Sequence, residues 1–477
     1  MAAEVAMPSD VMPAMDAGGV LANAAPTSEV VQGAPSTVHL AMQQQQVQQQ
    51  QQQQAAANEA FAAASFVTPL KEMCIEVVAK EFRNRPTFGK LNEGYIRKVV
   101  ALLDVELPLE VVGQLIIDEH YWRRRACKRW RNLEVSQHGG SWKQLYFERN
   151  LAEALERFDP NGGNSGTSSG SSGSSGDAEE IHDLESLRRL MEFSARYVHS
   201  LVLRQLPSHL DLQVLLSTLY TSLISLSLTY GMSNVGMDYD RSLFGMKLAD
   251  CRSLAKSLER CETLIHINLS NNLLDDDKVR MITSGLIDNM SVTHLDLSHN
   301  KIADRGARAL SKLLDSRSVL VNLELQDNEI HSEGARALAK GLRQNSSLLR
   351  LNLRLNRMGD EGGRALFDAL KLKHNNLLQL NVSSNSLSNF SSIACAGMLV
   401  NNSKLRTLDM SCNRVIGDAG KQIRDALLEN HGLLDLDMRM CGLDEEVYDA
   451  IRHILALRKE SHATSTTSVT GVGVSSA

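Results

Sequence analysis

Apolar residues recur with a period of 28 residues through the C-terminal half of the chain. Each period holds the alternation L-x-L and an asparagine three residues later, as in Leu323, Leu325 and Asn328. Further apolar residues follow ten and fourteen positions after the asparagine, at Leu338 and Leu342. The alternation is typical of a short strand with one buried face, and the later spacing is typical of an amphipathic helix.

The period itself predicts the fold. Successive asparagines lie 28, 28, 28, 29 and 28 residues apart, and a cysteine follows after 28 more, which gives the column Asn272, Asn300, Asn328, Asn356, Asn385, Asn413 and Cys441. A strand and a helix at this spacing form the long type of leucine-rich repeat. One repeat cannot bury its apolar surface alone, so repeats stack. We therefore predict an α/β fold, a leucine-rich repeat solenoid with a parallel concave sheet and convex helices.

Two weaker copies of the strand pattern, "VHSLVLRQL" and "LISLSL", lie upstream of the regular repeats. With them we expect nine strands in total. The asparagine side chains can bond backbone groups of neighbouring turns, where no regular strand pairing reaches. We therefore expect a buried structural ladder formed by Asn272, Asn300, Asn328, Asn356, Asn385 and Asn413.

Composition divides the rest of the chain. Gln/Ala-rich and Ser/Thr-rich segments bury too little apolar surface to fold, and Gly/Ser-rich segments are typical of flexible linkers. Helical periodicity and all three tryptophans fall in one stretch before the linker. We predict a disordered N-terminus over 1–64, a small all-helical domain over 65–160, a Gly/Ser linker over 161–176, the repeat domain over 177–458 and a disordered tail over 459–477.

Charge, hydropathy and cysteine usage limit the function classes. The net charge of -6 argues against a general nucleic-acid binder, and no apolar run approaches the roughly 20 residues of a membrane helix. The N-terminus lacks the basic region of a secretory signal, and the seven cysteines include no C-x-x-C pair. We also find no phosphate-loop, zinc-protease or nucleophile-elbow motif. We expect a soluble cytoplasmic protein that is not an enzyme and has no cofactor, metal, nucleic-acid or membrane partner.

The residue between the two strand leucines should point to the concave face. That column reads Asn268, Asp296, Glu324, Asn352, Asn381, Asp409 and Asp437. One interpretation is a solvated sheet face. The other is a trough for a basic segment of a partner, in which Asp296, Glu324, Asp409 and Asp437 attract lysine or arginine.

Two basic groups offer further contacts. The helical region carries a candidate docking cluster, Trp122, Arg123, Arg124, Arg125, Lys128, Arg129, Trp130 and Trp142, which could meet an acidic protein surface, form a solvated helix face or, with least support, bind nucleic acid. On the repeat helices, Arg280, Arg308, Arg336 and Arg364 form a ridge that could bind an acidic surface. Asp276, Asp304 and Asp360 lie four residues before three of these arginines, and we expect i,i+4 ion pairs between them.

Several longer strings resemble a known family. These are "RPTFG" (85–89), "DEHYWRRRACKRW" (118–130), "HGGSWKQLYFERNL" (138–151) and "LTYGMSNVGMDYDRSLFGMKLADCRSLAKSL" (228–258). They are similar to the dynein regulatory complex subunit 5 family, also called the t-complex-associated testis-expressed protein 1 family. The resemblance implies a non-enzymatic scaffold subunit of the nexin-dynein regulatory complex, in the cytoskeleton of the motile cilium or flagellum axoneme. Its partners would be the other subunits of that complex and the microtubule doublet.

Two alternatives use similar repeats. One is a GTPase-activating regulator of a small GTPase, whose family typically ends in a strongly acidic tail, whereas this tail is rich in Ser and Thr. The other is a ubiquitin-ligase substrate adaptor, in which a helical box precedes the repeats. The basic, Trp-rich stretch does not resemble that box.

Overall fold

The computed structural model describes residues 69–158, 183–207, 210–231, 240–372 and 375–469. The predicted disordered region over 1–64 and the Gly/Ser linker over 161–176 lie outside these ranges. The chain divides into two compact units, Met1–Cys74 and Ile75–Ala477. The repeats and the helices that pack on them belong to the second unit, which the following paragraphs describe.

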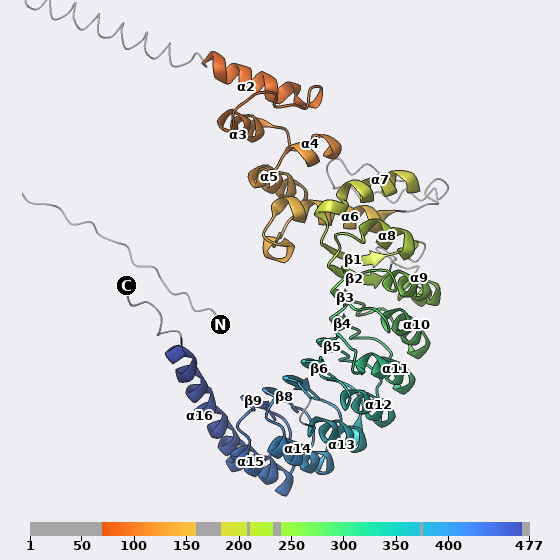
Figure 1. The fold of residues 1–477 in the computed structure, drawn as a ribbon, viewed down its shortest axis with the longest axis vertical. Coiled ribbons are helices and arrows are strands. Elements are labelled where there is room, and N and C mark those ends of the chain that lie inside the picture. The colour runs from red at the N-terminus through yellow and green to blue at the C-terminus, as the bar shows by residue number, and fades with distance from the viewer. Residues whose placement is uncertain (1–68, 159–182, 208–209, 232–239, 373–374, 470–477) are drawn as a thin grey trace, which may run out of the picture. The chain divides into compact units, whose positions relative to one another are not determined.

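A single parallel sheet runs through the repeats (Figure 1). Among the described residues its strands number nine and follow one another in chain order, which confirms the predicted number and the parallel arrangement: β1 (Ser200–Leu206), β2 (Ser225–Tyr230), β3 (His266–Asn268), β4 (His294–Asp296), β5 (Asn322–Glu324), β6 (Arg350–Asn352), β7 (Gln379–Asn381), β8 (Thr407–Asp409) and β9 (Asp435–Asp437). Because each strand pairs with the next in sequence, every connection must cross over one face of the sheet.

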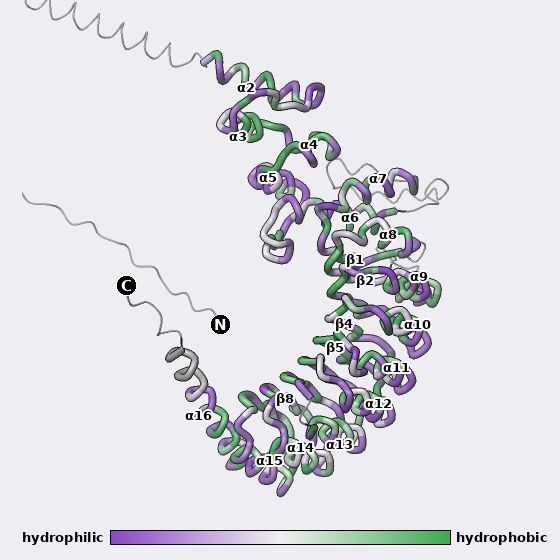
Figure 2. The backbone as a smooth tube through the Cα atoms, in the orientation of Figure 1, coloured by the Kyte–Doolittle hydropathy of each residue, from purple (hydrophilic) through white to green (hydrophobic). Residues whose placement is uncertain are grey.

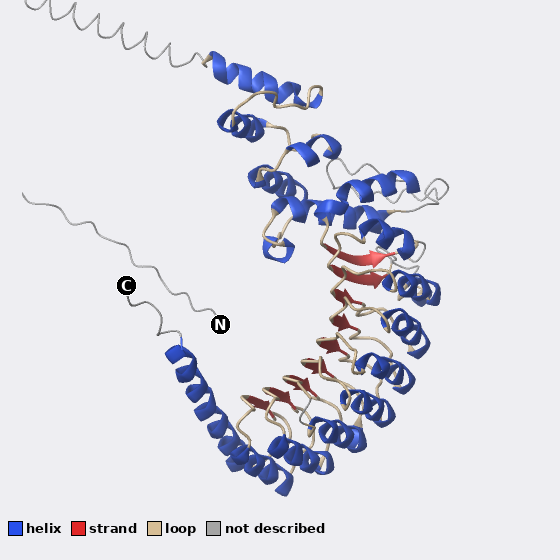
Figure 3. Ribbon diagram, in the orientation of Figure 1, coloured by secondary structure: helices blue, strands red, loops and turns tan. Residues whose placement is uncertain are grey.

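Helices fill those connections and cover one face of the sheet, while the strands line the inner side (Figure 3). They are α8 (Leu212–Leu219), α9 (Leu248–Leu258), α10 (Asp276–Leu286), α11 (Asp304–Leu310) with the 3₁₀ turn η6 (Ser311–Leu314), α12 (Ser332–Leu342), α13 (Gly359–Leu370), α14 (Asn389–Asn401) and α15 (Asp418–Glu429). A further helix, α16 (Glu445–Val469), follows the last strand. This is the leucine-rich repeat solenoid that the sequence predicts.

The core lies between the sheet and these helices. Leu323 and Leu325 of the strand and Leu338 and Leu342 of the helix are all at most 1% exposed. Figure 2 shows the same alternation, with apolar segments recurring in each strand and helix along the solenoid. Each fully buried leucine contributes about 1.5–3 kcal/mol, so stacking dominates the stability of a repeat.

The segment before the repeats is helical, as predicted. It contains α2 (Leu70–Lys80), η1 (Glu81–Arg83), α3 (Glu93–Leu102), α4 (Leu109–Leu115), α5 (Glu119–Arg129), η2 (Val135–His138) and α6 (Trp142–Arg157), and α7 (Leu184–Ser194) and η3 (Ala195–Tyr197) follow. Its buried side chains are continuous with those of the first repeats, so α6 and β1 share one core. The sequence alone suggested a helical domain joined to the repeats only by the linker.

Helix α6 covers the open edge of β1. The Glu148 carboxylate accepts hydrogen bonds from the backbone N–H groups of His199 at 2.9 Å and Ser200 at 2.7 Å. Glu156 accepts one from Arg204 at 2.5 Å. An uncovered edge strand would leave these donors unpaired and open to other chains. The helical region is therefore the N-terminal cap of the solenoid.

The last helix differs from the prediction. We expected a disordered tail from residue 459, but α16 continues to Val469, so that prediction is wrong for 459–469; residues 470–477 lie outside the described ranges. The Arg458 guanidinium donates to the carbonyl oxygen of Leu433 at 2.9 Å, and Lys459 pairs with Asp435 at 2.7 Å. These contacts fix the helix to the last repeat, and no glycine or proline interrupts it up to Val469.

Candidate interaction surfaces

The six asparagines of the repeat column are all buried, at 8% exposure or less. The Asn328 amide nitrogen donates to the carbonyl oxygens of Leu297 and Leu325, both at 3.1 Å, and its oxygen accepts the N–H of Ile302 at 3.1 Å. Equivalent bonds surround Asn272, Asn300, Asn356 and Asn413. The Asn385 amide nitrogen donates in the same way, to Leu353 at 2.7 Å, but its buried oxygen has no hydrogen-bond partner among the described residues. The column ties each repeat to the preceding one and has no surface left for a partner.

A second set of bonds joins each outer helix to the next. The Asp304 carboxylate accepts the N–H groups of His331 at 2.9 Å and Gly334 at 2.7 Å, at the start of α12. The first N–H groups of a helix have no partner within it, and its N-terminus favours negative charge. The same arrangement joins Asp276 to Ala303 and Gly306, and Asp360 to Ser388 and Ser391.

This arrangement replaces the ion pairs expected from the sequence. We predicted i,i+4 pairs between the aspartates at the helix starts and the arginine ridge, and the structure contradicts them. Arg280 pairs with Asp277 at 3.4 Å, and Arg364 pairs with Asp368 at 3.7 Å. The aspartates bind backbone donors of the following repeat instead, because those donors would otherwise be unpaired.

The Asp360 carboxyl shows the effect of these donors on its ionisation. Burial acts to raise its pKa, but hydrogen bonds from the hydroxyl and backbone N–H groups of Ser388 and Ser391 outweigh burial, so the pKa lies below its ordinary value. A depressed carboxyl pKa in the folded state means that the ionised form stabilises the fold.

The predicted concave column is a real row of neighbours. Strand pairing places Asp296 beside Glu324 and Asp409 beside Asp437. Three of these carboxylates also have an internal role. Asp296, Asp409 and Asp437 each accept the N–H of the residue two positions later in their own repeat, at 2.9–3.0 Å. Asparagines accept the same bond in other repeats, so this position selects a short side chain with an oxygen.

Three of the four carboxylates have further side-chain partners, and for Asp409 this is the Asn381 amide, which donates to it at 2.9 Å. The Arg439 side chain donates to both Asp437 oxygens, and these bonds hold the pKa of the Asp437 carboxyl below its ordinary value. Glu324 makes no bond to its own backbone and accepts one from the Asn322 side chain at 3.2 Å. Of the four predicted carboxylates, Glu324 therefore has the weakest structural explanation.

The predicted docking cluster splits into core and surface. Trp122 is fully buried, and its indole N–H donates to the carbonyl oxygen of Ile116 at 3.0 Å. Including Trp122 in a docking surface was therefore wrong, because its ring packs between those of Tyr121, Tyr146 and Phe147. A tryptophan beside a basic run was the only signal available in the sequence, and it did not reveal burial.

Most cations of the cluster bind within the cap. Arg124 donates to the Val100 carbonyl oxygen at 2.8 Å, and Arg129 pairs with Glu153 at 2.8 Å. The remaining members are placed as follows: Arg125 lies over the Tyr146 ring at 4.9 Å, Lys128 pairs with Glu106, Trp130 donates to Glu153 at 3.3 Å, and Arg123 lies 5.6 Å from the half-buried Trp142 ring. Arg123 and Lys128 remain exposed and could meet an acidic surface.

Sequence reasoning missed Glu148, which is 2% exposed and joins the cap to the sheet. Besides the two backbone donors of β1, it contacts His138 Nδ1 and accepts from the Gln144 amide at 2.9 Å. Its role depends on packing between segments about 50 residues apart, so no local pattern around it could have indicated it.

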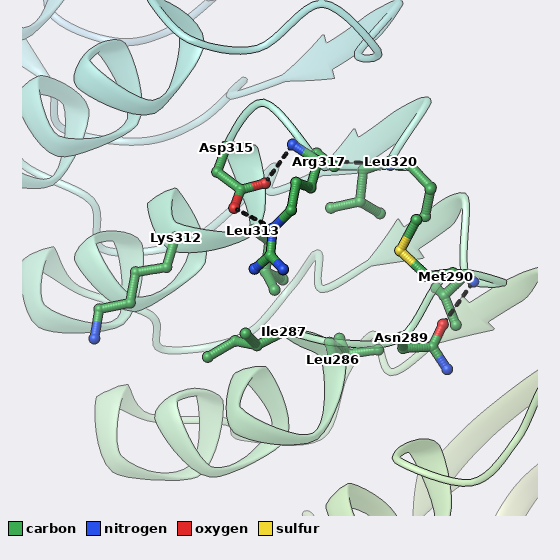
Figure 4. A pocket seen from close by; sticks show the side chains of 12 residues that line it. Leu286, Ile287, Asn289, Met290, Lys312, Leu313, Asp315, Arg317 and Leu320 are labelled. Atoms are coloured by element: carbon green, nitrogen blue, oxygen red, sulfur yellow. Dashed lines mark hydrogen bonds and ion pairs between the residues drawn. The ribbon is translucent and has the colours of Figure 1, made fainter.

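A surface pocket lies between the end of α10 and the η6 turn (Figure 4). Its walls include Ile287, Met290 and Leu313, and its Asp315 and Arg317 bind each other. Arg317 lies 28 residues after Asn289 and 28 residues before Asn345. In their own repeats, the side-chain oxygens of these asparagines accept the backbone N–H groups of Val292 and Leu348. The pocket thus marks a repeat in which the capping asparagine is replaced.

Among the residues that the structure describes, no group of three or more His, Cys, Asp or Glu side chains is placed to hold a metal ion. Within the same ranges, none of the helices combines the length and the apolar character needed to cross a membrane.

Comparison with known proteins agrees with the repeats and the resemblance. A family model described as "Leucine Rich repeat" matches residues 288–311, 318–339, 344–367 and 401–420. "Dynein regulatory complex subunit 5" of Chlamydomonas reinhardtii is 52% identical over 220 residues, covering 46% of this chain and 52% of that protein. Proteins of the same name from Mus musculus and Homo sapiens are 34% and 31% identical, over 49% and 47% of this chain and 48% and 46% of theirs.

The names of these relatives confirm the resemblance found in the sequence. The chain spans about half the length of the curated relatives that it matches. For this chain, the function of those longer proteins is therefore a proposal.

Proposed function

We propose that this chain is a non-enzymatic scaffold subunit of the nexin-dynein regulatory complex in the axoneme of motile cilia and flagella. There it would support the regulation of dynein-driven motility. The observation that carries the proposal is the 52% identity to a protein named dynein regulatory complex subunit 5, with two animal relatives of the same name. Its partners would be other subunits of that complex, with the microtubule doublet as a further contact.

The architecture supports a scaffold role. Both ends of the sheet are associated with helices, since α6 binds the edge of β1 and α16 is fixed to the last repeat. A capped solenoid presents a long surface without polymerising through its strand edges. The concave face is bare of helices (Figure 3), and most of its polar side chains lie half-buried or exposed. Such a surface suits extended contacts with another protein.

The alternative functions have less support. None of the three relatives described above is named as a regulator of a small GTPase or as a ubiquitin-ligase adaptor. The candidate concave residues Asp296, Glu324, Asp409 and Asp437 remain a proposed contact surface, and the same holds for Arg123 and Lys128 of the cap.

The proposal is tested in Chlamydomonas reinhardtii cells from which dynein regulatory complex subunit 5 has been deleted. The full chain with an epitope tag is expressed, and axonemes are isolated and extracted with increasing salt. We expect the tagged chain to remain with the axonemes and, once extracted, to purify together with other subunits of the complex. Cells expressing the tag alone serve as the control. Recovery of the chain only in the soluble fraction would overturn the proposal.

A further inference from the structure

A positive stripe begins on strand β6 of the concave face and continues into the turn that follows it, between the two pairs of carboxylates. The repeat reads "RLNLRLNR" over residues 350–357 and places Arg350, Arg354 and Arg357 at exposed positions. Within the described residues, none of the three side chains has a hydrogen bond or ion pair. Their charge is therefore available to a ligand.

Arg350 and Arg354 have neutral residues at the equivalent positions of both flanking repeats, whereas Asp327 and Glu329 of the preceding repeat are equivalent to Leu355 and Arg357. Strand pairing places Arg350 between Asn322 and Gln379. The corresponding neighbours of Arg354 in the flanking repeats are Gln326 and Ser383. The positive charge is felt nearby, since burial, His266 and Arg350 together lower the pKa of His294.

In another repeat, the arginine at the equivalent position is neutralised by a carboxylate of its own repeat. Arg439 occupies the position equivalent to Arg354, and its side chain forks onto Asp437, two residues earlier. The residue two before Arg354 is Asn352, an amide that cannot form an ion pair. Asn352 and Asp437 make the same backbone bond, to the N–H of Arg354 at 3.1 Å and of Arg439 at 3.0 Å. The two repeats thus differ in charge and share their local structure.

An apolar side chain completes the stripe. Leu355 is 44% exposed and has a φ of 56°, in the left-handed region that leucine rarely adopts. Most repeats place Asn, His, Asp or Ser at this position, which tolerate that backbone better or are polar: Asn271, His299, Asp327 and Ser384. Cys412 and Met440 occupy this position in two later repeats, so Leu355 adds an exposed apolar side chain beside Arg354 as Met440 does beside Arg439.

We propose that Arg350, Arg354, Leu355 and Arg357 bind an extended acidic peptide segment of a partner protein, with Leu355 contacting an apolar side chain in it. Arg350 and Arg354 lie about 13 Å apart along the strand, which matches acidic side chains four residues apart on one face of an extended peptide. The stripe is one strand wide, and Glu324 and Asp409 flank it at one and two strands' distance. A continuous nucleic-acid backbone, with closely spaced phosphates, would meet those carboxylates.

The test measures binding by the full chain directly, by fluorescence anisotropy. The probe is a fluorescein-labelled peptide Ser-Glu-Ser-Glu-Ser-Glu-Leu-Ser, and the control peptide has Gln in place of each Glu. We expect the acidic peptide to bind, with an affinity that falls as salt rises, and the Gln peptide to bind much more weakly. Arg354→Gln should weaken binding about three- to tenfold. Arg308→Gln, the same change at an exposed position on an outer helix, should leave it unchanged.

Two variants separate binding from folding. Asn352→Asp should give Arg354 the partner that Arg439 has, so binding should weaken about as much as in Arg354→Gln while the fold is kept. Leu355→Asn should raise the melting temperature, because asparagine tolerates the left-handed backbone, and should still weaken binding.

The proposal is overturned if the acidic peptide does not bind, or if Arg354→Gln and Asn352→Asp bind it as well as the wild type does. It is also overturned if an oligouridylate probe binds more tightly than the peptide and depends on Arg354, which would make the stripe a nucleic-acid surface. Because this assay contains no axonemal component, its failure would leave the proposed scaffold function standing.

Discussion

Substitution of Asn328 by leucine tests the stacking of the repeats. The side chain is 6% exposed, so the change removes a buried amide from the middle of the solenoid. It leaves the Ile302 N–H without its acceptor, at 3.1 Å in the native structure, whereas the Leu297 carbonyl oxygen keeps a second donor, the Asn300 amide at 2.9 Å. A buried group left unpaired costs about 1–3 kcal/mol, so the substitution should destabilise the fold by about 1–3 kcal/mol.

The assay is urea unfolding followed by far-UV circular dichroism, supported by the melting temperature. A domain of this size loses about 2–4 °C per kcal/mol, so the melting temperature should fall by about 2–12 °C. Asn328→Cys should be intermediate, because Cys441 at the equivalent position bonds to the Met410 carbonyl oxygen at 3.2 Å. Asn401→Leu, on the exposed end of α14, is the matched control and should change stability by less than about 0.5 kcal/mol. Equal stability of the Asn328 and Asn401 variants would refute the reasoning.

Four further predictions follow from the same contacts. Glu148→Ala removes the acceptor of two backbone N–H groups of β1 and should lower the free energy of unfolding in urea by about 2–4 kcal/mol. The more exposed Glu156→Ala should lower it by about 1 kcal/mol, and equal losses would contradict the role of Glu148 in joining the cap to the sheet. Asp296→Asn keeps the backbone bond and should stay within about 0.5 kcal/mol of wild type, whereas Asp296→Ala should lose about 0.5–1.5 kcal/mol; similar losses for both would remove the structural explanation of this carboxylate. Because the pKa of the Asp360 carboxyl is depressed in the folded state, its ionised form stabilises the fold above the unfolded-state pKa near 4, and this stabilisation is lost as the pH falls further. Asp360→Asn should therefore flatten the acid limb of a pH–stability curve below about pH 5. An unchanged acid limb would contradict this role of Asp360. Deletion of eight residues from 161–176 should leave the unfolding transition and assembly unchanged, and loss of either would show that this segment sets a required distance.

The repeats could be predicted from the sequence because their information is local and periodic. Leu323 and Leu325 define a buried strand face, and Leu338 and Leu342 define a buried helix face. The strand and helix of each repeat can therefore be predicted from the sequence of that repeat alone. Strand number, strand order and the neighbours in the concave column all follow from that period. The interior position of the asparagines is also set by spacing, since Asn328 and its equivalents lie where regular strand pairing ends.

The contacts that depend on tertiary packing could not be predicted in this way. Trp122 and Arg124 look like surface residues in a basic run, but the cap buries the ring and binds the guanidinium. Asp276 was expected to pair within its own helix, because sequence spacing shows only intrahelical neighbours and not the N-terminus of the following helix. Glu148 binds a strand about 50 residues away, and no local signal marks such a partner.

The charge of the concave face depends both on the repeat spacing and on the tertiary contacts of each charged side chain. The column Asp296, Glu324, Asp409 and Asp437 is visible in the sequence and suggested a trough for a basic segment. The structure shows that three of these carboxylates accept backbone bonds, and that the side chains of Arg350 and Arg354 stand without partners among the described residues. The repeat spacing therefore predicts where a charged side chain lies. Whether that side chain is free to bind a partner depends on the residue two positions earlier and on the residue one strand away.

Cryo-electron tomography of axonemes tests whether this chain is a scaffold of the nexin-dynein regulatory complex. Axonemes from Chlamydomonas reinhardtii cells lacking subunit 5 are compared with axonemes from the same cells expressing this chain. The account predicts that expression restores density at the nexin link, with the outline of a capped solenoid. Link density that is identical with and without the chain, although the chain is expressed and folded, would contradict the account.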